Sequence, residues 1–416
     1  MNKEIIEKYI GKANPWWNEE EKFELGIEYK ERKIYSEIAK FFPTKQIISL
    51  TGLRRVGKTT LMMKLIKQSL ENNFNKLNIL YFSFDEFSDL RILDLFEIYE
   101  NLISKIDKTK KYLICLDEIQ KLKNWSEQLK VAYDLHPNIK FIISGSESLF
   151  IRKKSKESLA GRIYEFKINP LSFKEFLEFR NIKINNFFIQ KEKIIENFKQ
   201  FLISGGFPEL INSKEEEARK YINEGIVDKI IYKDLPDVFE VKNSTLMKSI
   251  FNIIYNDPGQ IIEIQELSKE LGVSRQLVSN YLEYLEQAFL IKKLYNFSNN
   301  ARKTERKLKR YYSTLLNSLI IESNFPKVFE QFLVIQLDAE FFWRDVFKNE
   351  VDIIKTNPLA AIEIKSGEIK DRNLESLRKF IYKFNPKNTL VLSYDIEKEI
   401  NKIKVIPFYK YLLGKN

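Results

Sequence analysis

The sequence predicts an α/β protein that begins on a parallel β-sheet and continues through a helical middle into a second α/β region. In the first third, helix-like segments separate four short apolar runs, which are 46–50, 77–84, 112–116 and 140–144. These runs are too short for buried helices, and their alternation with helices predicts parallel strands covered on both faces. The pattern is helical from about residue 171 to 257, and strand-like runs return near 350–365 and 388–394.

Composition narrows the class of protein further. Of 416 residues, 44% are hydrophobic and 13% aromatic, which suits two to four packed domains and excludes a disordered chain. One Cys and one His exclude a disulfide framework and a multi-Cys zinc site, and they argue against His-based catalysis. No apolar run reaches the ~18 residues of a membrane span and the amino terminus lacks a signal peptide, so we expect a cytoplasmic protein with no membrane partner.

The net charge bears on possible partners. Lys and Arg number 69 against 58 Asp and Glu, which gives a formal charge of +11. Such a surplus favours polyanions such as nucleic acid. A Lys-rich composition with solvated surfaces explains the same numbers equally well, so the charge alone decides nothing.

A glycine-rich segment follows the first predicted strand. Residues 52–59 satisfy the pattern G-x-x-x-x-G-K-[ST] between a strand and an amphipathic helix. In that context backbone N–H groups and the helix amino terminus cradle phosphates. Lys58 is expected to neutralise the β- and γ-phosphates, and Thr59 to ligate Mg²⁺. The predicted nucleotide-binding residues of this loop are Gly52, Leu53, Arg54, Arg55, Val56, Gly57, Lys58, Thr59 and Thr60.

Polar residues end two later strands. Asp117 and Glu118 follow the run 112–116, and we expect Asp117 to hold the Mg²⁺ shell and Glu118 to polarise the attacking water. Ser144 and Ser146 lie at the end of the strand predicted over 140–144, where a hydroxyl could contact the γ-phosphate. A plain Gly-Ser turn is the alternative for this segment.

Together these motifs resemble a known family. TGLRRVGKTTL, LICLDEIQ, IISGSES and SLAGRIYEFKINPLSFKEF are similar to AAA+-type P-loop ATPases of an archaeal and bacterial group that carries a nuclease-like tail. Asn14-Pro15-Trp16-Trp17 resembles that group's amino-terminal box. The resemblance implies ATP with Mg²⁺, and a homo-oligomer in which Arg162 acts as a finger on a neighbour's nucleotide. An arginine that pairs with local acids is the alternative reading of Arg162.

The middle of the chain predicts a helix-turn-helix. Residues 261–295 give a short helix, a turn at 272–274 and a second helix capped by Ser274, followed by a candidate wing. Arg275, Gln276 and Asn280 lie near the start of the second helix, where they could contact DNA. The alternative is a winged helix used for protein contacts, because Glu283 and Glu286 make the same helix acidic.

The carboxyl-terminal region brings carboxylates together. A hairpin centred on residues 356–359 sets Asp352 opposite Glu363, with Lys365 on the same face as Glu363. Two carboxylates can hold Mg²⁺ or Mn²⁺, and the lysine can activate water for phosphodiester attack. The spacing resembles the PD-(D/E)xK nuclease core, in which Glu330 matches the upstream acid. The strand KRYYSTLL lacks the acid of the Tyr-x-x-Asp step that relatives often carry after the winged helix.

The predicted architecture therefore has four parts. They are an AAA+-like ATPase core with its amino-terminal segment at 1–175, a helical lid at 176–256, a winged helix at 257–300 and a restriction-endonuclease-like α/β domain at 301–416. The predicted function is ATP hydrolysis coupled to action on nucleic acid, with Glu118, Arg162 and Lys365 as catalytic residues. The alternative is a nucleotide-dependent signalling or scaffold switch whose inactive tail binds a partner.

Overall fold

The computed structural model describes residues 3–18, 30–145 and 158–414. It divides into two compact units, Met1–Pro170 and Leu171–Asn416. Each unit has its own sheet. Among the described residues, no helix combines the length and the apolar character needed to cross a bilayer.

The first unit is built on a five-stranded parallel sheet, as the sequence predicts. Its strands are β1 (Ile47–Thr51), β2 (Ile79–Ser83), β3 (Tyr112–Asp117), β4 (Ile139–Gly145) and β5 (Ile163–Lys167). Their order across the sheet is β2-β3-β4-β1-β5, and all four pairings are parallel. The carboxyl ends of all five strands therefore meet at one edge, where polar loop residues can converge.

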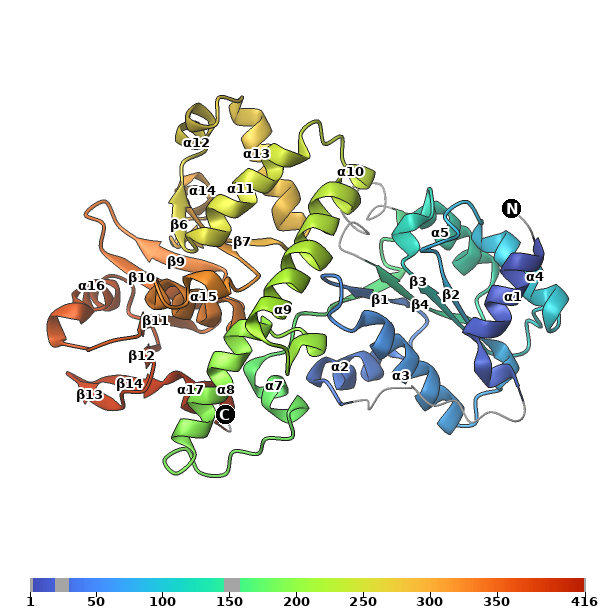
Figure 1. Ribbon diagram of the computed structural model, residues 1–416, viewed down its shortest axis with the longest axis horizontal. Helices are drawn as coiled ribbons and strands as arrows, with labels where there is room; N and C mark the ends of the chain where they lie inside the picture. The colour runs from blue at the N-terminus through green and yellow to red at the C-terminus, as the bar shows by residue number, and fades with distance from the viewer. Residues whose placement is uncertain (1–2, 19–29, 146–157, 415–416) are drawn as a thin grey trace. The chain divides into compact units, whose positions relative to one another are not determined.

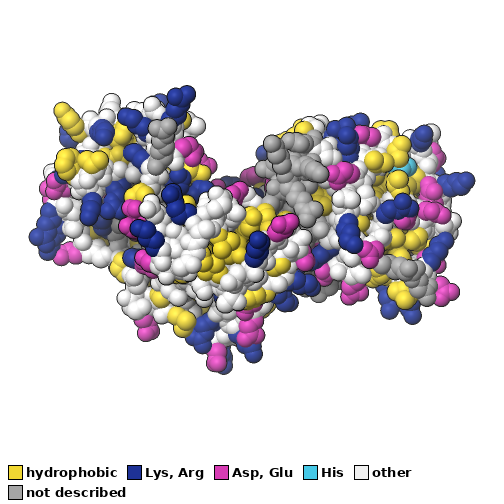
Figure 2. All heavy atoms as spheres, turned by 90° about the horizontal axis from the view of Figure 1, so that it is seen from above, with side chains coloured by type: hydrophobic (Ala, Val, Ile, Leu, Met, Phe, Trp, Pro, Cys, Tyr) yellow, Lys and Arg dark blue, Asp and Glu magenta, His cyan; other side chains and the backbone are white. Residues whose placement is uncertain are grey.

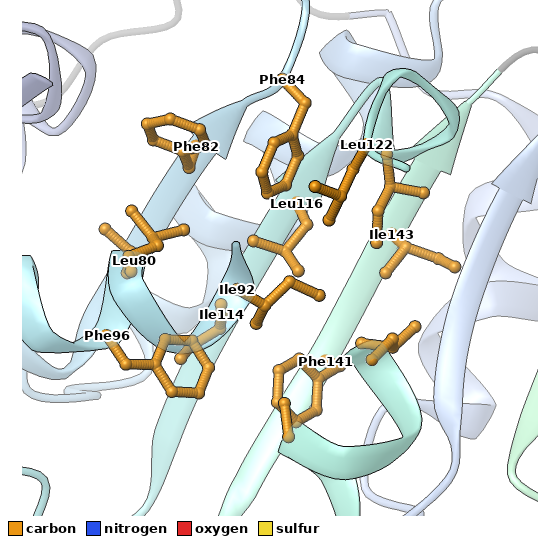
Figure 3. Close-up of a cluster of buried hydrophobic side chains, with 14 of the residues drawn as sticks. Leu80, Phe82, Phe84, Ile92, Phe96, Ile114, Leu116, Leu122, Phe141 and Ile143 are labelled. Carbon is orange, nitrogen blue, oxygen red and sulfur yellow. The ribbon is translucent and has the colours of Figure 1, made fainter. Parts of the chain in front are cut away.

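Helices cover both faces of this sheet (Figure 1). They are α1 (Lys3–Ala13), α2 (Lys33–Phe41), α3 (Lys58–Glu71), α4 (Ile92–Leu102) and α5 (Trp125–Leu135). On one face, side chains of α1, α4 and α5 pack against alternate residues of β2, β3 and β4. Figure 3 shows this core, with Phe96 of α4 lying against Ile114 of β3 and Phe141 of β4. Because α2 and α3 cover the other face, β1 and β3 are buried along their whole lengths.

The amino-terminal box closes the free edge of β2. The Asn14 side chain donates to the Tyr81 carbonyl at 2.9 Å and accepts from the Tyr81 amide at 2.7 Å, so it pairs as another strand would. Trp16 and Trp17 donate their indole N–H groups to the Ile79 carbonyl. An edge strand with free backbone groups invites pairing with other chains, and this box removes that exposure.

The second unit begins with helices that lead into the predicted helix-turn-helix. They are α7 (Phe173–Phe179), α8 (Lys191–Ser204), α9 (Glu215–Lys220), two π-helical segments (Tyr221–Asp228 and Ile230–Asp234), α10 (Leu235–Val238), α11 (Ser244–Asn256), α12 (Ile264–Glu270) and α13 (Arg275–Gln287). As predicted, the Ser274 side chain accepts from the Leu277 amide and caps α13. Assignment of α12 and α13 to a winged helix stays a prediction.

A nine-stranded mixed sheet runs through the second unit. Its strands are β6 (Gln260–Ile262), β7 (Ile291–Asn296), β8 (Lys309–Ser313), β9 (Phe341–Arg344), β10 (Glu350–Thr356), β11 (Leu359–Lys365), β12 (Asn388–Ser393), β13 (Lys398–Ile400) and β14 (Ile403–Pro407). The order is β13-β14-β12-β11-β10-β9-β7-β8-β6. The boundary predicted at residue 300 thus falls between two strands that pair, because β7 and β8 are antiparallel neighbours and β7 also pairs with β9.

Helices cover both faces of the larger part of that sheet. The remaining helices are α14 (Ala301–Arg306), α15 (Phe325–Gln336), α16 (Glu375–Phe384) and α17 (Phe408–Leu413). On one face α7, α8, α15 and α17 contribute a cluster of aromatic rings, which includes Phe173, Phe198, Phe332 and Phe408. On the other face α16 packs through Leu377 and Phe380. The strands β10 and β11 therefore lie in a buried layer, and their few charged residues need partners.

Candidate functional site

The glycine-rich loop connects β1 to α3 at the carboxyl edge of the first sheet. Gly52 has a φ of +146°, and a Cβ placed on it would lie 2.2 Å from the Ile168 carbonyl oxygen. Gly57, directly before α3, has a φ of +94°. These two positions therefore need glycine for different reasons, the first for a close backbone approach and the second for its left-handed conformation.

Lys58 begins α3 and turns back over the loop. Its ammonium donates to the carbonyl of Gly52 at 3.0 Å and to that of Leu53 at 2.8 Å, and the side chain is buried. The loop thus holds a positive charge beside the helix amino terminus, where backbone N–H groups favour anions. Leu53 and Val56 are buried and support the loop, whereas Arg54 is half-buried, Arg55 is exposed and Thr60 is half-buried.

Asp117 joins three strands and a helix at this edge. One carboxylate oxygen accepts from the Thr59 hydroxyl at 2.7 Å and from the Tyr81 hydroxyl at 3.0 Å. The other accepts from the Ser144 hydroxyl and from the Glu118 amide. The structure brings Thr59 and Asp117 together as predicted for a magnesium site. Ser144, a candidate γ-phosphate contact, donates to Asp117, and its contact with a phosphate stays a prediction. Ser146 lies outside the described residues.

Glu118 follows Asp117 in a left-handed backbone conformation with a φ of +51°. The Gln120 amide donates to its carboxylate, which orients the side chain. Burial raises the pKa of Glu118, Lys58 lowers it in part, and Asp117 raises it further. A carboxyl with a raised pKa beside a phosphate-binding loop is suited to accept a proton.

Three supporting residues were missed in the sequence. Arg32 is buried and donates to the carbonyl oxygens of Val56 and Asn169, both at 3.0 Å, so it connects the end of the loop to the chain after β5. Tyr81 contacts Asp117, and burial followed by that carboxylate raises its pKa, so its hydroxyl stays a donor. Gln120 donates to the Glu118 carboxylate from two residues further along the chain. No local pattern marks Arg32, because its partners are far along the chain.

Arg162 lies at the other end of the sheet from the loop. Its backbone carbonyl accepts from the amide of Ile47, where β1 begins. Since β1 spans five residues, roughly 15 Å separates this end from the loop. Its guanidinium forms two hydrogen bonds with Asp134, at 3.1 and 3.2 Å. Arg162 therefore cannot reach a nucleotide in its own loop, and action on a neighbouring subunit stays a prediction.

The carboxyl-terminal hairpin has the predicted register. Thr356 pairs with Leu359 and Ile353 with Ile362, so the next positions along are Asp352 and Glu363. Asp352 accepts from the Ile364 amide at 2.8 Å, and Lys365 donates to Glu363 at 2.6 Å, which places the lysine beside that carboxylate as predicted. The second oxygen of Glu363 is buried and has no hydrogen-bond partner.

A buried arginine occupies the centre of the carboxylate cluster, which we define as Glu330, Glu350, Asp352 and Glu363. Arg310 of β8 donates to Glu330 at 3.0 Å, forms an ion pair with Glu350, and lies 3.7 Å from Asp352. Tyr312 donates to Glu330 at 2.6 Å. Sequence reasoning missed Arg310, although a charged residue within the apolar strand KRYYS is a signal that it needs a buried partner.

Burial and mutual repulsion shift proton affinities in this cluster. Burial, then the Asp352 carboxylate, raise the pKa of Glu363 to about 8, although Lys365 opposes them. The same two causes raise the pKa of Glu330 to about 7 against the effect of Arg310. Across the described residues, no group of three or more His, Cys, Asp or Glu side chains is arranged to hold a metal ion. The metal site expected at Glu330, Asp352 and Glu363 stays a prediction.

Comparisons with known proteins match one part of the chain to an AAA domain and most of its length to uncharacterised relatives. Residues 44–177 match the model of a family described as an AAA domain, and residues 195–318 match a family described as a domain of unknown function. The chain is 28% identical over 421 residues to an uncharacterised protein of Methanocaldococcus jannaschii, covering 94% of this chain and 93% of the relative. It is 26% identical over 404 residues to an uncharacterised protein of Haemophilus influenzae, covering 91% and 96%.

Among solved structures, the Walker-type ATPase of Pyrococcus abyssi aligns with a TM-score of 0.46 at 17% identity, over 74% of this chain and 99% of that one. The match to the AAA domain supports a P-loop ATPase-like domain over residues 44–177. A domain of this kind implies ATP and usually Mg²⁺ as ligands.

The close approach at Gly52 generates a first prediction. In Gly52→Ala, the added methyl group would overlap the Ile168 carbonyl, so the loop must move and nucleotide binding should weaken at least tenfold. Titration with a fluorescent ATP analogue measures this. Gly11→Ala is the matched control, because nothing lies within 4 Å of a Cβ placed there. Unchanged affinity in Gly52→Ala would contradict the tight packing of the loop.

Proposed function

We propose that this protein binds ATP with Mg²⁺ at the loop of residues 52–59 and hydrolyses the γ-phosphate. The observation that carries the proposal is the convergence of Lys58, Thr59, Asp117 and Glu118 at one sheet edge. Lys58 lies where it can neutralise phosphate charge, and the adjacent Thr59 hydroxyl and Asp117 carboxylate are oxygen donors of the type that Mg²⁺ prefers. Mg²⁺, when bound, offsets the charge that develops on the phosphates.

Glu118 is the base in this proposal. Its carboxylate is oriented by Gln120, and its raised pKa improves its ability to take a proton from water near neutral pH. Asp117 cannot share that role, because its oxygens already accept from Thr59, Tyr81, Ser144 and the Glu118 amide. The two adjacent carboxylates are therefore given different tasks by their surroundings.

A second prediction separates binding from hydrolysis. Lys58→Ala should weaken ATP binding, because it removes the charge beside the phosphates. Glu118→Gln should bind ATP normally and lose about 10²–10⁴-fold in turnover, the usual contribution of a general base. In the wild type, turnover should fall with decreasing pH at a value above the ordinary 4.5 of a glutamate, because only the ionised base is active. Titration with ATP measures binding, and the rate of phosphate release measures turnover. Equal turnover in wild type and Glu118→Gln would exclude the assigned role.

We propose that Arg162 acts in trans, so that hydrolysis needs an oligomer. The support is its distance from its own loop together with its resemblance to a finger arginine. A third prediction follows: Arg162→Ala should lose roughly 10³-fold in turnover, and mixing it with Lys58→Ala should restore part of it. Asp134→Ala is the control, because it breaks the ion pair but keeps the guanidinium. If Asp134→Ala reproduces the loss and mixing fails, Arg162 is a structural residue.

We further propose that ATP hydrolysis is coupled to nucleic acid, in keeping with the charge of +11 and with the helices α12 and α13. Arg275, Gln276 and Asn280 lie on the first turns of α13, and Gln276 and Asn280 hydrogen-bond to each other. The acidic residues Glu283 and Glu286 of α13 favour the alternative, a switch that contacts protein.

A metal-dependent nuclease site in the tail is a second candidate function. The observation that favours it is the buried, unpartnered oxygen of Glu363, close to Asp352 and Lys365. Arg310 already supplies a cation to Glu330, Glu350 and Asp352, which favours a structural cluster instead. Binding of Mn²⁺ distinguishes the two.

The fourth prediction concerns that binding. Calorimetry should detect Mn²⁺ in the wild type and not in Asp352→Ala/Glu363→Ala. Because burial and the Asp352 carboxylate raise the pKa of Glu363, binding of Mn²⁺ to the ionised carboxylate should release protons and tighten as the pH rises. Glu399→Ala on β13, whose side chain is exposed, is the control. Identical Mn²⁺ binding in the double variant would make the tail a scaffold and favour the switch.

A further inference from the structure

An exposed strip of the second unit combines lysines with unshielded aromatic rings. It consists of the turn between β9 and β10 (Phe347 and Lys348), the outer face of α16 (Lys379, Tyr382 and Lys383) and the segment around α14 (Lys303 and Lys307). Phe347 is 84% and Tyr382 94% exposed. Figure 2 shows Lys and Arg side chains beside hydrophobic ones over this unit at the left of the view.

Hydrogen bonds and ring contacts connect the three parts of this basic aromatic strip. The Lys379 ammonium donates to the Asn349 side chain at 3.0 Å, which joins α16 to the turn. Lys383 lies 5.4 Å from the ring centroid of Phe384, and that ring lies 5.3 Å from Phe297. The Phe297 carbonyl in turn accepts from Lys307 at 3.2 Å. These contacts join α16 to the turn and, through the buried ring of Phe297, to the segment around α14, so the three parts lie next to one another.

The turn that carries Phe347 is held in place. Asp345 accepts from the amides of Phe347 and Asn349, both at 2.9 Å, and from the Asn349 side chain at 2.8 Å. A fixed turn that presents an aromatic ring to water gives up burial of that ring, which usually stabilises a fold. Residues of this kind commonly mark a surface that binds a partner.

The charge around the strip is positive. Burial lowers the pKa of Lys307, and the nearby ammonium groups of Lys383 and Lys303 lower it further, so three cations repel one another here. Of the acids on the same elements, Asp345 is occupied by its turn, Glu375 offsets the charge of Lys379, and Glu305 is exposed, so the positive charge of the strip rests mainly on Lys303, Lys307, Lys348 and Lys383. An anionic ligand would relieve the repulsion.

We propose that this basic aromatic strip binds single-stranded nucleic acid, with phosphates on the lysines and bases stacked on Tyr382 and Phe347. Aromatic rings on a basic surface are the usual platform for unpaired bases, whereas the bases of a duplex are already stacked on each other. The proposal extends the proposed action on nucleic acid, but it stands on a surface other than α13. It can fail while ATP hydrolysis stands.

Fluorescence anisotropy of the full chain with labelled oligo-dT, oligo-rU and a duplex tests this. Tyr382→Ala/Phe347→Ala should weaken single-strand binding about tenfold or more per ring and leave duplex binding unchanged. Lys303→Glu/Lys383→Glu should weaken it and reduce the slope of log affinity against log salt by about 0.7 for each lysine. Phe188→Ala and Lys174→Glu are the matched controls, because both residues are exposed and lie on other elements of the unit.

Each outcome decides the proposal. The proposal is supported if either oligonucleotide binds more tightly than the duplex, and if this binding is lost in both double variants and kept in both controls. Comparison of oligo-dT with oligo-rU shows whether DNA or RNA is preferred. Unchanged affinity in the aromatic variant overturns the proposal. The proposal is also overturned if polyglutamate displaces the oligonucleotide completely and the aromatic variant no longer binds polyglutamate. The strip would then bind an acidic polypeptide. If the wild type hydrolyses ATP but binds no oligonucleotide, this inference fails and the ATPase proposal does not.

Discussion

The arrangement of the glycine-rich loop and the strand ends beside it depends on the Asp117 carboxylate. It accepts hydrogen bonds from the start of α3 through Thr59, from β2 through Tyr81, from β4 through Ser144 and from the next backbone amide. An ionised carboxylate only accepts, so these donors can all be satisfied at once. Because Ser144 and Tyr81 are buried, loss of this acceptor would leave them without a partner, which is costly. The same group that connects the strands therefore also orients Thr59, the residue that we propose as a Mg²⁺ ligand.

The amino-terminal box extends this hydrogen-bonded arrangement beyond the loop. Asn14 pairs with the backbone of Tyr81 on the outside of β2, while the Tyr81 hydroxyl contacts Asp117, so the amino-terminal box supports the site through one residue.

In the second unit, the buried carboxylates are neutralised by a side chain of the protein itself, because Arg310 pairs with Glu330 and Glu350 and lies near Asp352. Where the protein supplies its own counterion, a carboxylate cluster needs no metal to persist.

The sequence predicted the elements that depend on local patterns. The parallel sheet, the glycine-rich loop, the Ser274 cap and the hairpin about residues 356–359 were predicted because strand spacing, capping chemistry and turn symmetry are read from neighbouring residues. Arg32, Tyr81 and Arg310 were missed, because each has a partner far away in the sequence. Their partners Asn169, Asp117 and Glu330 lie 137, 36 and 20 residues further along the chain. The pairing of β7 with both β8 and β9 was also not predictable, since the sequence does not show which edges meet.

We propose that Asp117 organises a site for Mg²⁺ with ATP, and calorimetry of ATP binding with and without Mg²⁺ tests this role most directly. In the wild type Mg²⁺ should tighten ATP binding at least tenfold. In Asp117→Asn the side chain keeps its size but loses its charge, so ATP should still bind through Lys58 and the dependence on Mg²⁺ should disappear. The same dependence on Mg²⁺ in Asp117→Asn as in the wild type would contradict this account.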